Sequence, residues 1–303
     1  MNTTDDDSSS SRLLDTVKGS FYLLDFLISS IFTILITHTV WRDSVLKKEV
    51  RYFLLCHHLV CLTLFFGLGT IFNLIRAFQL NAPVLVCWII FAVQIMFGKA
   101  VLLTLVLMAL NTCIAICWPL KYLRLAHSLK FKLTACLWII ALLDPVVSLL
   151  YESIQMGQQY IVKLDPTCPT TLSSTFSRIF GIIFIIILVI LIVGSYIIIF
   201  REGKRAGHFT KSNHQAKRTI LIHGLQLALH IIPTVMTIWI GGKPDYFTLD
   251  LTSFIIFSLG QCLSPVVHGL RSSELRQKFN ERHSCCGALD RYGPENFQNG
   301  HSM

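Results

Sequence analysis

Two ionisable side chains interrupt long apolar stretches of the sequence, where they are the residues best placed to do chemistry. Lys99 lies within the apolar stretch 84–117, and Asp144 lies within "IIALLDPVVS". Burial of a charge in a membrane is costly, so each residue is a functional candidate. Two interpretations stay open. Lys99 and Asp144 form a buried ion pair that fixes the packing, or Lys99 meets an anionic or carbonyl-bearing ligand.

The segments that carry these residues are long enough to cross a membrane. Of the 303 residues, 53% are hydrophobic and 14% are charged, whereas ordinary globular domains have about 25% charged residues. A helix of about 20 apolar residues crosses the hydrocarbon, and it satisfies its own backbone there. The sequence therefore predicts an all-α membrane protein with seven spans, at about 21–40, 52–75, 84–117, 133–154, 179–200, 219–240 and 247–269.

Basic residues are distributed unequally between alternate connections. If the N-terminus is outside, the three inner loops and the tail hold four, four, six and five Lys or Arg residues, and the outer segments hold six. This asymmetry follows the positive-inside rule. It predicts an extracellular N-terminus (1–20), a seven-helix domain (21–269) and a cytoplasmic tail (270–303) in the plasma membrane. The net charge of +9 is then a topological signal and does not indicate a nucleic-acid partner.

The same topology divides the ten cysteines. Only Cys87, at the outer start of the third span, and Cys168, between the fourth and fifth spans, fall on the oxidising side of the membrane. We therefore expect a Cys87–Cys168 disulfide that holds the loop over the helices. Asn2, in Asn2-Thr3-Thr4, is a predicted glycosylation site on the same side. The polar first residues do not form a signal peptide, so we expect the first span to direct insertion.

Several motifs resemble those of the rhodopsin-like (class A) G-protein-coupled receptors. Trp138 lies mid-span in the fourth segment, and "LSPVVHG" around Pro265 resembles the family's Asn-Pro-x-x-Tyr motif. "MALNTCIAICWPLKY" (108–122) resembles a signature of odorant receptors. "KRTILIHGLQLAL" (217–229) and "LSPVVHGLR" (263–271) resemble segments of fish-type odorant receptors and a related orphan group. The resemblance implies a small-molecule ligand among helices three, five, six and seven, and signalling to a heterotrimeric G protein.

The resemblance also selects ligand-binding candidates by their depth. Lys99 lies about 18 Å along a helix from Cys87, at the depth of the ligand cavity in this fold, and Asp144 lies roughly 15 Å from the outer end of its span. Both are therefore candidates. The further candidates are Asn73 and Glu152 near the expected outer mouth and His230 in the sixth span.

The activation residues of the resembled family are missing. At the inner end of helix three, an acidic residue, an arginine and an aromatic are replaced by Asn111, Thr112 and Cys113. Leu62 stands where helix two carries a sodium-binding aspartate, and leucine supplies no oxygen ligand. His268 stands in place of the tyrosine that follows Pro265. Two interpretations follow: a receptor with an atypical switch, or a non-signalling or partner-dependent member that acts in a receptor heteromer.

The tail carries two further predicted membrane contacts. "SSELRQKFN" (272–280) is expected to form a short amphipathic eighth helix whose basic residues meet anionic lipid. Cys285 and Cys286 follow as candidate palmitoylation sites.

Other functional classes find less support in the sequence. It has no phosphate-binding Gly-rich loop, no His-Glu-x-x-His motif and no nucleophile elbow, so we expect neither an enzyme nor a cofactor or metal site. A transporter is the less favoured alternative, because no internal repeat divides the chain into two halves.

Overall fold

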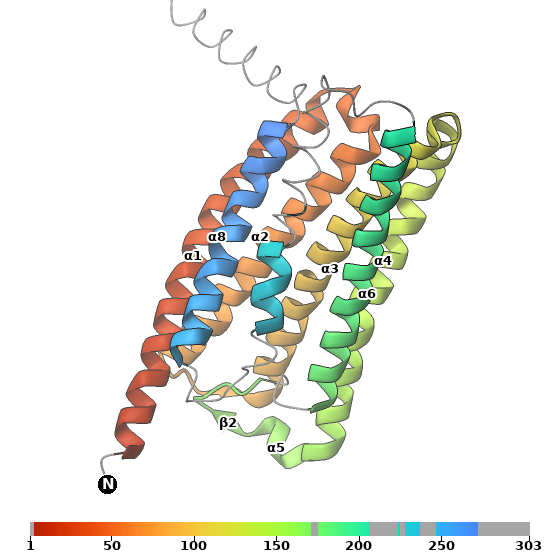
Figure 1. Ribbon diagram of the computed structural model, residues 1–303. Helices are drawn as coiled ribbons and strands as arrows, with labels where there is room; N and C mark the ends of the chain where they lie inside the picture. Colours follow the sequence, from red (N-terminus) through yellow and green to blue (C-terminus); the bar gives the residue numbers. More distant parts are fainter. Residues whose placement is uncertain (1–2, 171–174, 206–223, 225–227, 237–246, 272–303) are drawn as a thin grey trace, which may run out of the picture.

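The computed structural model describes residues 3–170, 175–205, 224, 228–236 and 247–271. Its long helices are α1 (Thr3–Arg42), α2 (Val50–Ala77), α3 (Val84–Cys117), α4 (Pro119–Met156), α6 (Thr175–Arg205) and α8 (Phe247–Arg271), which run side by side as one bundle (Figure 1). Residues 228–236, within the expected sixth span, are also helical. In the described part of the chain, five helices are long and apolar enough to cross a membrane, and α8 adds the shorter apolar helix Thr248–Cys262.

Short elements close the two ends of the bundle. The 3-10 helix η1 (Leu46–Lys48) joins α1 to α2. At the other end, the strand β1 (Ala82–Pro83) precedes α3, and the helix α5 (Gln158–Val162) and the strand β2 (Leu164–Asp165) follow α4. The two strands pair antiparallel, with Ala82 opposite Asp165. These strands are two residues each, so the fold of the described residues is helical apart from this one pair.

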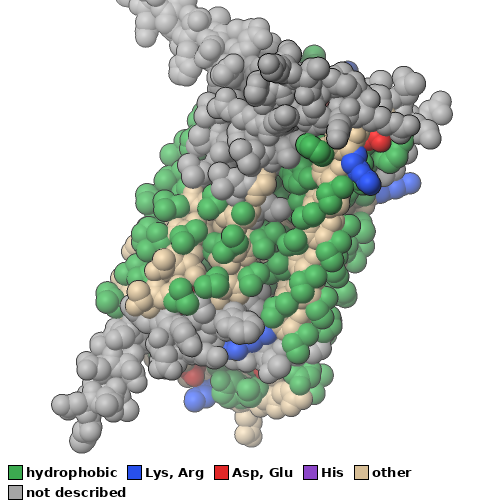
Figure 2. All heavy atoms as spheres, in the orientation of Figure 1, with side chains coloured by type: hydrophobic (Ala, Val, Ile, Leu, Met, Phe, Trp, Pro, Cys, Tyr) green, Lys and Arg blue, Asp and Glu red, His purple; other side chains and the backbone are tan. Residues whose placement is uncertain are grey.

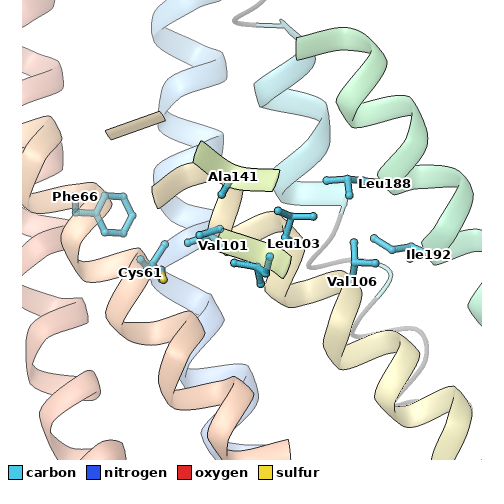
Figure 3. Close-up of a cluster of buried hydrophobic side chains, with 11 residues drawn as sticks. Cys61, Phe66, Val101, Leu103, Val106, Ala141, Leu188 and Ile192 are labelled. Carbon is cyan, nitrogen blue, oxygen red and sulfur yellow. The ribbon is translucent and has the colours of Figure 1, made fainter. Parts of the chain in front are cut away.

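The helix α3 lies at the centre of the packing, because it contacts α2, α4 and α6. Buried side chains of all four helices meet in the main hydrophobic cluster, among them Phe66 of α2, Val101 of α3, Ala141 of α4 and Leu188 of α6 (Figure 3). The helix α1 packs on the other side of α2, and α8 packs against α1. The bundle therefore has two arms, α1 with α8 and α4 with α6, joined through α2 and α3.

The outer surface of the bundle matches hydrocarbon. On the face shown in Figure 2, hydrophobic side chains cover the middle of the bundle, and the charged side chains in view lie toward its two ends. Ile139 of α4 and Ile190 of α6 are among the large apolar side chains that the surface of the bundle exposes. In water such a surface would aggregate, whereas in lipid it needs no covering partner.

Two helices are longer than the expected spans. The helix α1 begins at Thr3 instead of residue 21, and α4 begins at Pro119 instead of residue 133. Ion pairs attach the extension of α1 to its neighbours. Arg76 of α2 donates from Nε to Asp15 (3.1 Å), and Lys18 donates to Asp250 of α8 (2.6 Å). Proline is accepted at the first position of a helix, where no backbone N–H is needed, so α4 starts directly after Trp118.

Gly69 of α2 allows α1, α2 and α3 to approach closely. A Cβ at this position would lie 2.6 Å from the Tyr22 ring and 2.6 Å from Nε2 of Gln94. The Tyr22 ring is held between Phe65, Phe66 and Phe254, with ring centroids 4.9–6.1 Å away, so it has little room to move.

We expect Gly69→Ala to lower the free energy of unfolding by about 1–3 kcal/mol, because the added methyl group overpacks this contact. The midpoint of thermal unfolding of the purified protein in detergent measures the loss. Gly194→Ala on α6 is the matched control, since no atom lies within 4 Å of the Cβ it would add. Equal midpoints for the two variants would contradict the prediction.

Candidate functional site

The loop between α4 and α6 is fixed to the start of α3. A disulfide joins Cys87 to Cys168, as the sequence predicted, with both residues fully buried. The backbone N–H of Val84 also donates to the carbonyl of Lys163 (3.1 Å). Within the loop, the side chain and the backbone of Thr167 donate to Asp165, and these hydrogen bonds lower the pKa of the Asp165 carboxyl below its usual value. We call this end of the bundle the disulfide end.

Lys99 and Asp144 meet inside the bundle. The ammonium group of Lys99 donates to Oδ2 of Asp144, which links α3 to α4. Lys99 is only 8% exposed, and its Nζ lies 4.9 Å from the centre of the Phe184 ring on α6. The ion pair expected in the packing interpretation is therefore present, and it joins three helices at one point.

Polar groups without partners lie beside this ion pair on α4. Oδ1 of Asp144 and Oγ of Ser148 are buried with no hydrogen-bond partner in the described part of the chain. Glu152, one turn further toward the disulfide end, is 7% exposed, and no hydrogen bond or ion pair to it is found among the described residues. This region offers hydrogen-bond acceptors that the described residues do not use.

The other two ligand-binding candidates make separate contacts. Asn73 of α2 is buried and donates from its amide to the carbonyl of Gly69 (2.7 Å) within its own helix. His230 is buried with its ring 6.5 Å from the ring of Phe257 on α8. The geometry thus brings Lys99, Asp144 and Glu152 to one side of α3, while His230 faces α8.

Asp25 of α1 is a buried acid that sequence reasoning missed. It is 1% exposed, and it accepts hydrogen bonds from the hydroxyl of Ser258 (2.6 Å) and the thiol of Cys262, both on α8. The signal was present in "FYLLDFLISS", where an acid interrupts an apolar run in the same way as Lys99 does. Asp25 links α1 to α8 through these two hydrogen bonds.

Of the expected switch residues, Thr112 and Cys113 lie toward the end of the bundle opposite the disulfide, and Leu62 lies near the middle of α2. The Thr112 hydroxyl donates to the carbonyl of Met108 in its own helix (2.9 Å). The Cys113 side chain is buried, with its sulfur 3.9 Å from that of Cys117. Leu62 is 1% exposed within the main hydrophobic cluster. Thr112 therefore makes its hydrogen bond locally, and Leu62 contributes to apolar packing.

Some predicted sites are outside the reach of the structure. Asn2, Cys285, Cys286 and the expected amphipathic helix 272–280 lie outside the described residues. Pro265 and His268 lie in the last turns of α8, where the structure describes the backbone but not the side chains. The roles of these residues stay predictions.

The ion pair between Lys99 and Asp144 yields a stability prediction. We expect Lys99→Ala to lower the free energy of unfolding by about 3–5 kcal/mol, because it leaves the Asp144 carboxylate buried without a cation. Thermal unfolding in detergent and the amount of protein at the cell surface measure the effect. The double variant Lys99→Met with Asp144→Leu is expected to recover most of the loss, because it removes both charges. A double variant as unstable as Lys99→Ala would contradict this account.

Asp25 yields a second stability prediction. Asp25→Ala leaves the Ser258 hydroxyl and the Cys262 thiol without their acceptor, which is expected to cost about 1–3 kcal/mol of unfolding free energy. Asp25→Asn keeps an acceptor oxygen and is expected to cost less. Glu202→Ala, which removes a less buried acid on α6, is the control. An equal midpoint of thermal unfolding for Asp25→Ala and Glu202→Ala would refute the prediction.

Comparison with known proteins agrees with the architecture. The family model "7 transmembrane receptor (rhodopsin family)" matches residues 21–267, which is well over half of the chain and includes all of the expected spans almost to the end of the last. Odorant receptor 131-2 of Danio rerio is 27% identical to the chain over 213 residues. The match spans 65% of this chain and 65% of that receptor, which is slightly less than two thirds of its length.

These findings confirm the predicted all-α, seven-transmembrane fold and the resemblance to odorant receptors. They agree with the long apolar helices and with the disulfide between the start of α3 and the following loop. The chain is a multi-pass membrane protein that belongs to the rhodopsin family of seven-transmembrane receptors.

Proposed function

We propose that this protein is a plasma-membrane receptor that binds a small molecule in the disulfide-end half of the bundle and signals to a heterotrimeric G protein from the opposite end. The family match over residues 21–267 carries the proposal, because receptors of this family share that arrangement. The similarity to an odorant receptor favours a small ligand. The uneven distribution of basic residues supports an orientation with the N-terminus and the disulfide end outside the cell.

The polar groups beside α3 support a ligand site in that half. The disulfide and the β1–β2 pair hold the loop after α4 against the start of α3. Below this loop, Oδ1 of Asp144 and the Ser148 hydroxyl are buried acceptors that no described residue uses, and the buried residue Glu152 lies one turn further along α4. Buried polar groups are normally satisfied, so unused acceptors in such a position favour a bound molecule.

The switch in this proposal works without a charged lock. The hydrogen bond of Thr112 to the Met108 carbonyl stays within α3, so it does not tie α3 to another helix. The resting state would then depend on apolar packing around Leu62 and on the hydrogen bonds of Asp25 to α8. A ligand that shifts the helices of one arm against α3 would change this packing.

A non-signalling or partner-dependent receptor is the second candidate function. The same local hydrogen bond of Thr112 favours it, because no long cationic side chain at this position is available to contact a G protein. Such a protein would act through another receptor in a heteromer.

Basal signalling separates the two candidates. Asn111→Asp together with Thr112→Arg restores an acid and an arginine at the inner end of α3, and we expect it to raise basal G-protein signalling by roughly fivefold or more, a shift of about 1 kcal/mol. The measurement is surface-normalised basal activity across the main G-protein families and arrestin, beside the wild type. Asn111→Gln with Thr112→Ser is the matched control, because it changes both positions without adding charge.

Each of three outcomes of this measurement bears on the proposal. Wild-type activity above that of untransfected cells supports a working switch of unusual chemistry. A silent wild type with an active double variant supports the partner-dependent protein, in which coupling was lost at these two positions. A double variant that reaches the surface and stays at the control level would show that the switch region alone does not limit coupling.

A further inference from the structure

The unused acceptors on α4 form a regular stripe. Asp144, Ser148 and Glu152 follow each other at intervals of four residues, so they lie on one face of the helix over about 12 Å. All three lie in the half of α4 that leads to the disulfide end, and Asp144 contacts Lys99 of α3. We call these three residues the α4 stripe.

The Ser148 hydroxyl differs from comparable hydroxyls in the bundle. Ser153 of α4, Ser195 of α6 and Thr104 of α3 each donate to the carbonyl four residues earlier, at 2.6–2.7 Å. Ser148 makes no such bond, although it is only 4% exposed. Its oxygen therefore stays available between the two carboxylates of the stripe.

Charge is not balanced along the α4 stripe. Asp144 is paired with Lys99, whose ammonium group contacts its Oδ2, and Glu152 adds a second carboxylate to the stripe. Among the described residues, no cation is paired with Glu152. A buried carboxylate without a cation is strongly unfavourable, so the stripe needs one additional positive charge.

We infer that the α4 stripe binds a small protonated amine, with the ammonium group beside Ser148. This inference rests on the proposed receptor function, because it names the class of ligand that the receptor takes. Residues four apart on a helix have Cβ atoms about 5–6 Å apart, so an ammonium group beside Ser148 reaches a carboxylate on either side. Its three N–H groups match Oγ of Ser148 and Oδ1 of Asp144, which have no hydrogen-bond partner among the described residues, and the carboxylate of Glu152.

The backbone of α4 adds one more acceptor near the stripe. Pro145 lies inside the helix and has no N–H to donate to the carbonyl of Ala141, one turn earlier. Ala141 is fully buried in the main hydrophobic cluster, beside Leu137 and Val101. The apolar part of an amine would therefore meet a hydrophobic wall, while its charged end stays at the carboxylates.

The test measures binding directly on the purified full-length receptor in detergent. The probe is n-hexylamine, which is protonated at neutral pH, and hexan-1-ol serves as a neutral probe of the same length. We expect hexylamine to raise the midpoint of thermal unfolding in a concentration-dependent way and hexan-1-ol not to do so. Glu152→Gln is expected to weaken amine binding at least about tenfold, since it removes the buried charge partner. Ser148→Ala is expected to weaken it roughly threefold to tenfold.

Matched variants control for general damage to the fold. Ser153→Ala lies on the same helix but removes a hydroxyl that is bonded to the Leu149 carbonyl, so it should leave amine binding unchanged. Each variant is compared with its own amine-free midpoint, and Ser148→Ala keeps the test valid if Glu152→Gln folds poorly. An equal shift with hexylamine and hexan-1-ol, or an amine shift that persists in both Glu152→Gln and Ser148→Ala, overturns the inference.

The binding assay tests the amine site, and the signalling assay tests the receptor function, so a negative result in one can be told from a negative result in the other. An amine that binds at the stripe without changing G-protein or arrestin signals supports the site and counts against the proposed signalling. Signalling by a neutral ligand, unchanged in Glu152→Gln, supports the receptor function and overturns the amine site.

Discussion

Hydrocarbon supplies no hydrogen-bond partners, and this constraint governs every polar side chain in the described bundle. Many of the hydroxyl groups make a hydrogen bond within their own helix, as Thr112 does by donating to the carbonyl one turn earlier. A backbone carbonyl of the same helix does not neutralise a charge, so charged groups take partners on neighbouring helices. Lys99 with Asp144 joins α3 to α4, and Asp25 with Ser258 joins α1 to α8. One buried polar link thus lies within the arm of α1 and α8, and the other attaches the arm of α4 and α6 to α3.

The departures from these pairings are concentrated in one place. Asp144 Oδ1 and Ser148 are buried and unsatisfied, and Glu152 on the same face has no cation among the described residues. The loop above is held by the disulfide, so the disulfide-end half combines a rigid rim with unused polar groups. Rigid support around unsatisfied groups is typical of a binding site, because the cost of leaving them unpaired is offset when a ligand arrives.

The expected switch residues are held by apolar packing and by a local hydrogen bond. Leu62 lies in the main hydrophobic cluster, where it packs with Val101 and Leu103 of α3. Cys113 is buried near Cys117. Apolar contacts around Leu62 therefore help to hold α2 against α3. Contacts that stabilise the bundle need not be contacts that switch its conformation.

Much of this architecture could be predicted from the sequence. Apolar segments long enough to cross a membrane determine the helices, and the position of two cysteines relative to those helices determines the disulfide, because only that side of the membrane is oxidising. Lys99 and Asp144 were recognisable because charge interrupts apolar runs. Asp25 carried the same signal. The ends of α1 and α4 did not, since charged residues recur in both extensions and neither extension forms a long apolar run.

Only the tertiary structure decided which of these groups satisfy one another. Lys99 could have faced a ligand or Asp144, and the approach of α3 to α4 selects Asp144 as its partner. Ser148 looked like any serine of a membrane helix until its unused hydroxyl was seen beside Glu152. The hydropathy of a segment depends only on its own residues, so the sequence is enough to predict which segments enter the membrane. Which polar side chains pair with each other depends on how the helices are rotated and how far apart they lie. Side-chain packing across the whole bundle determines both.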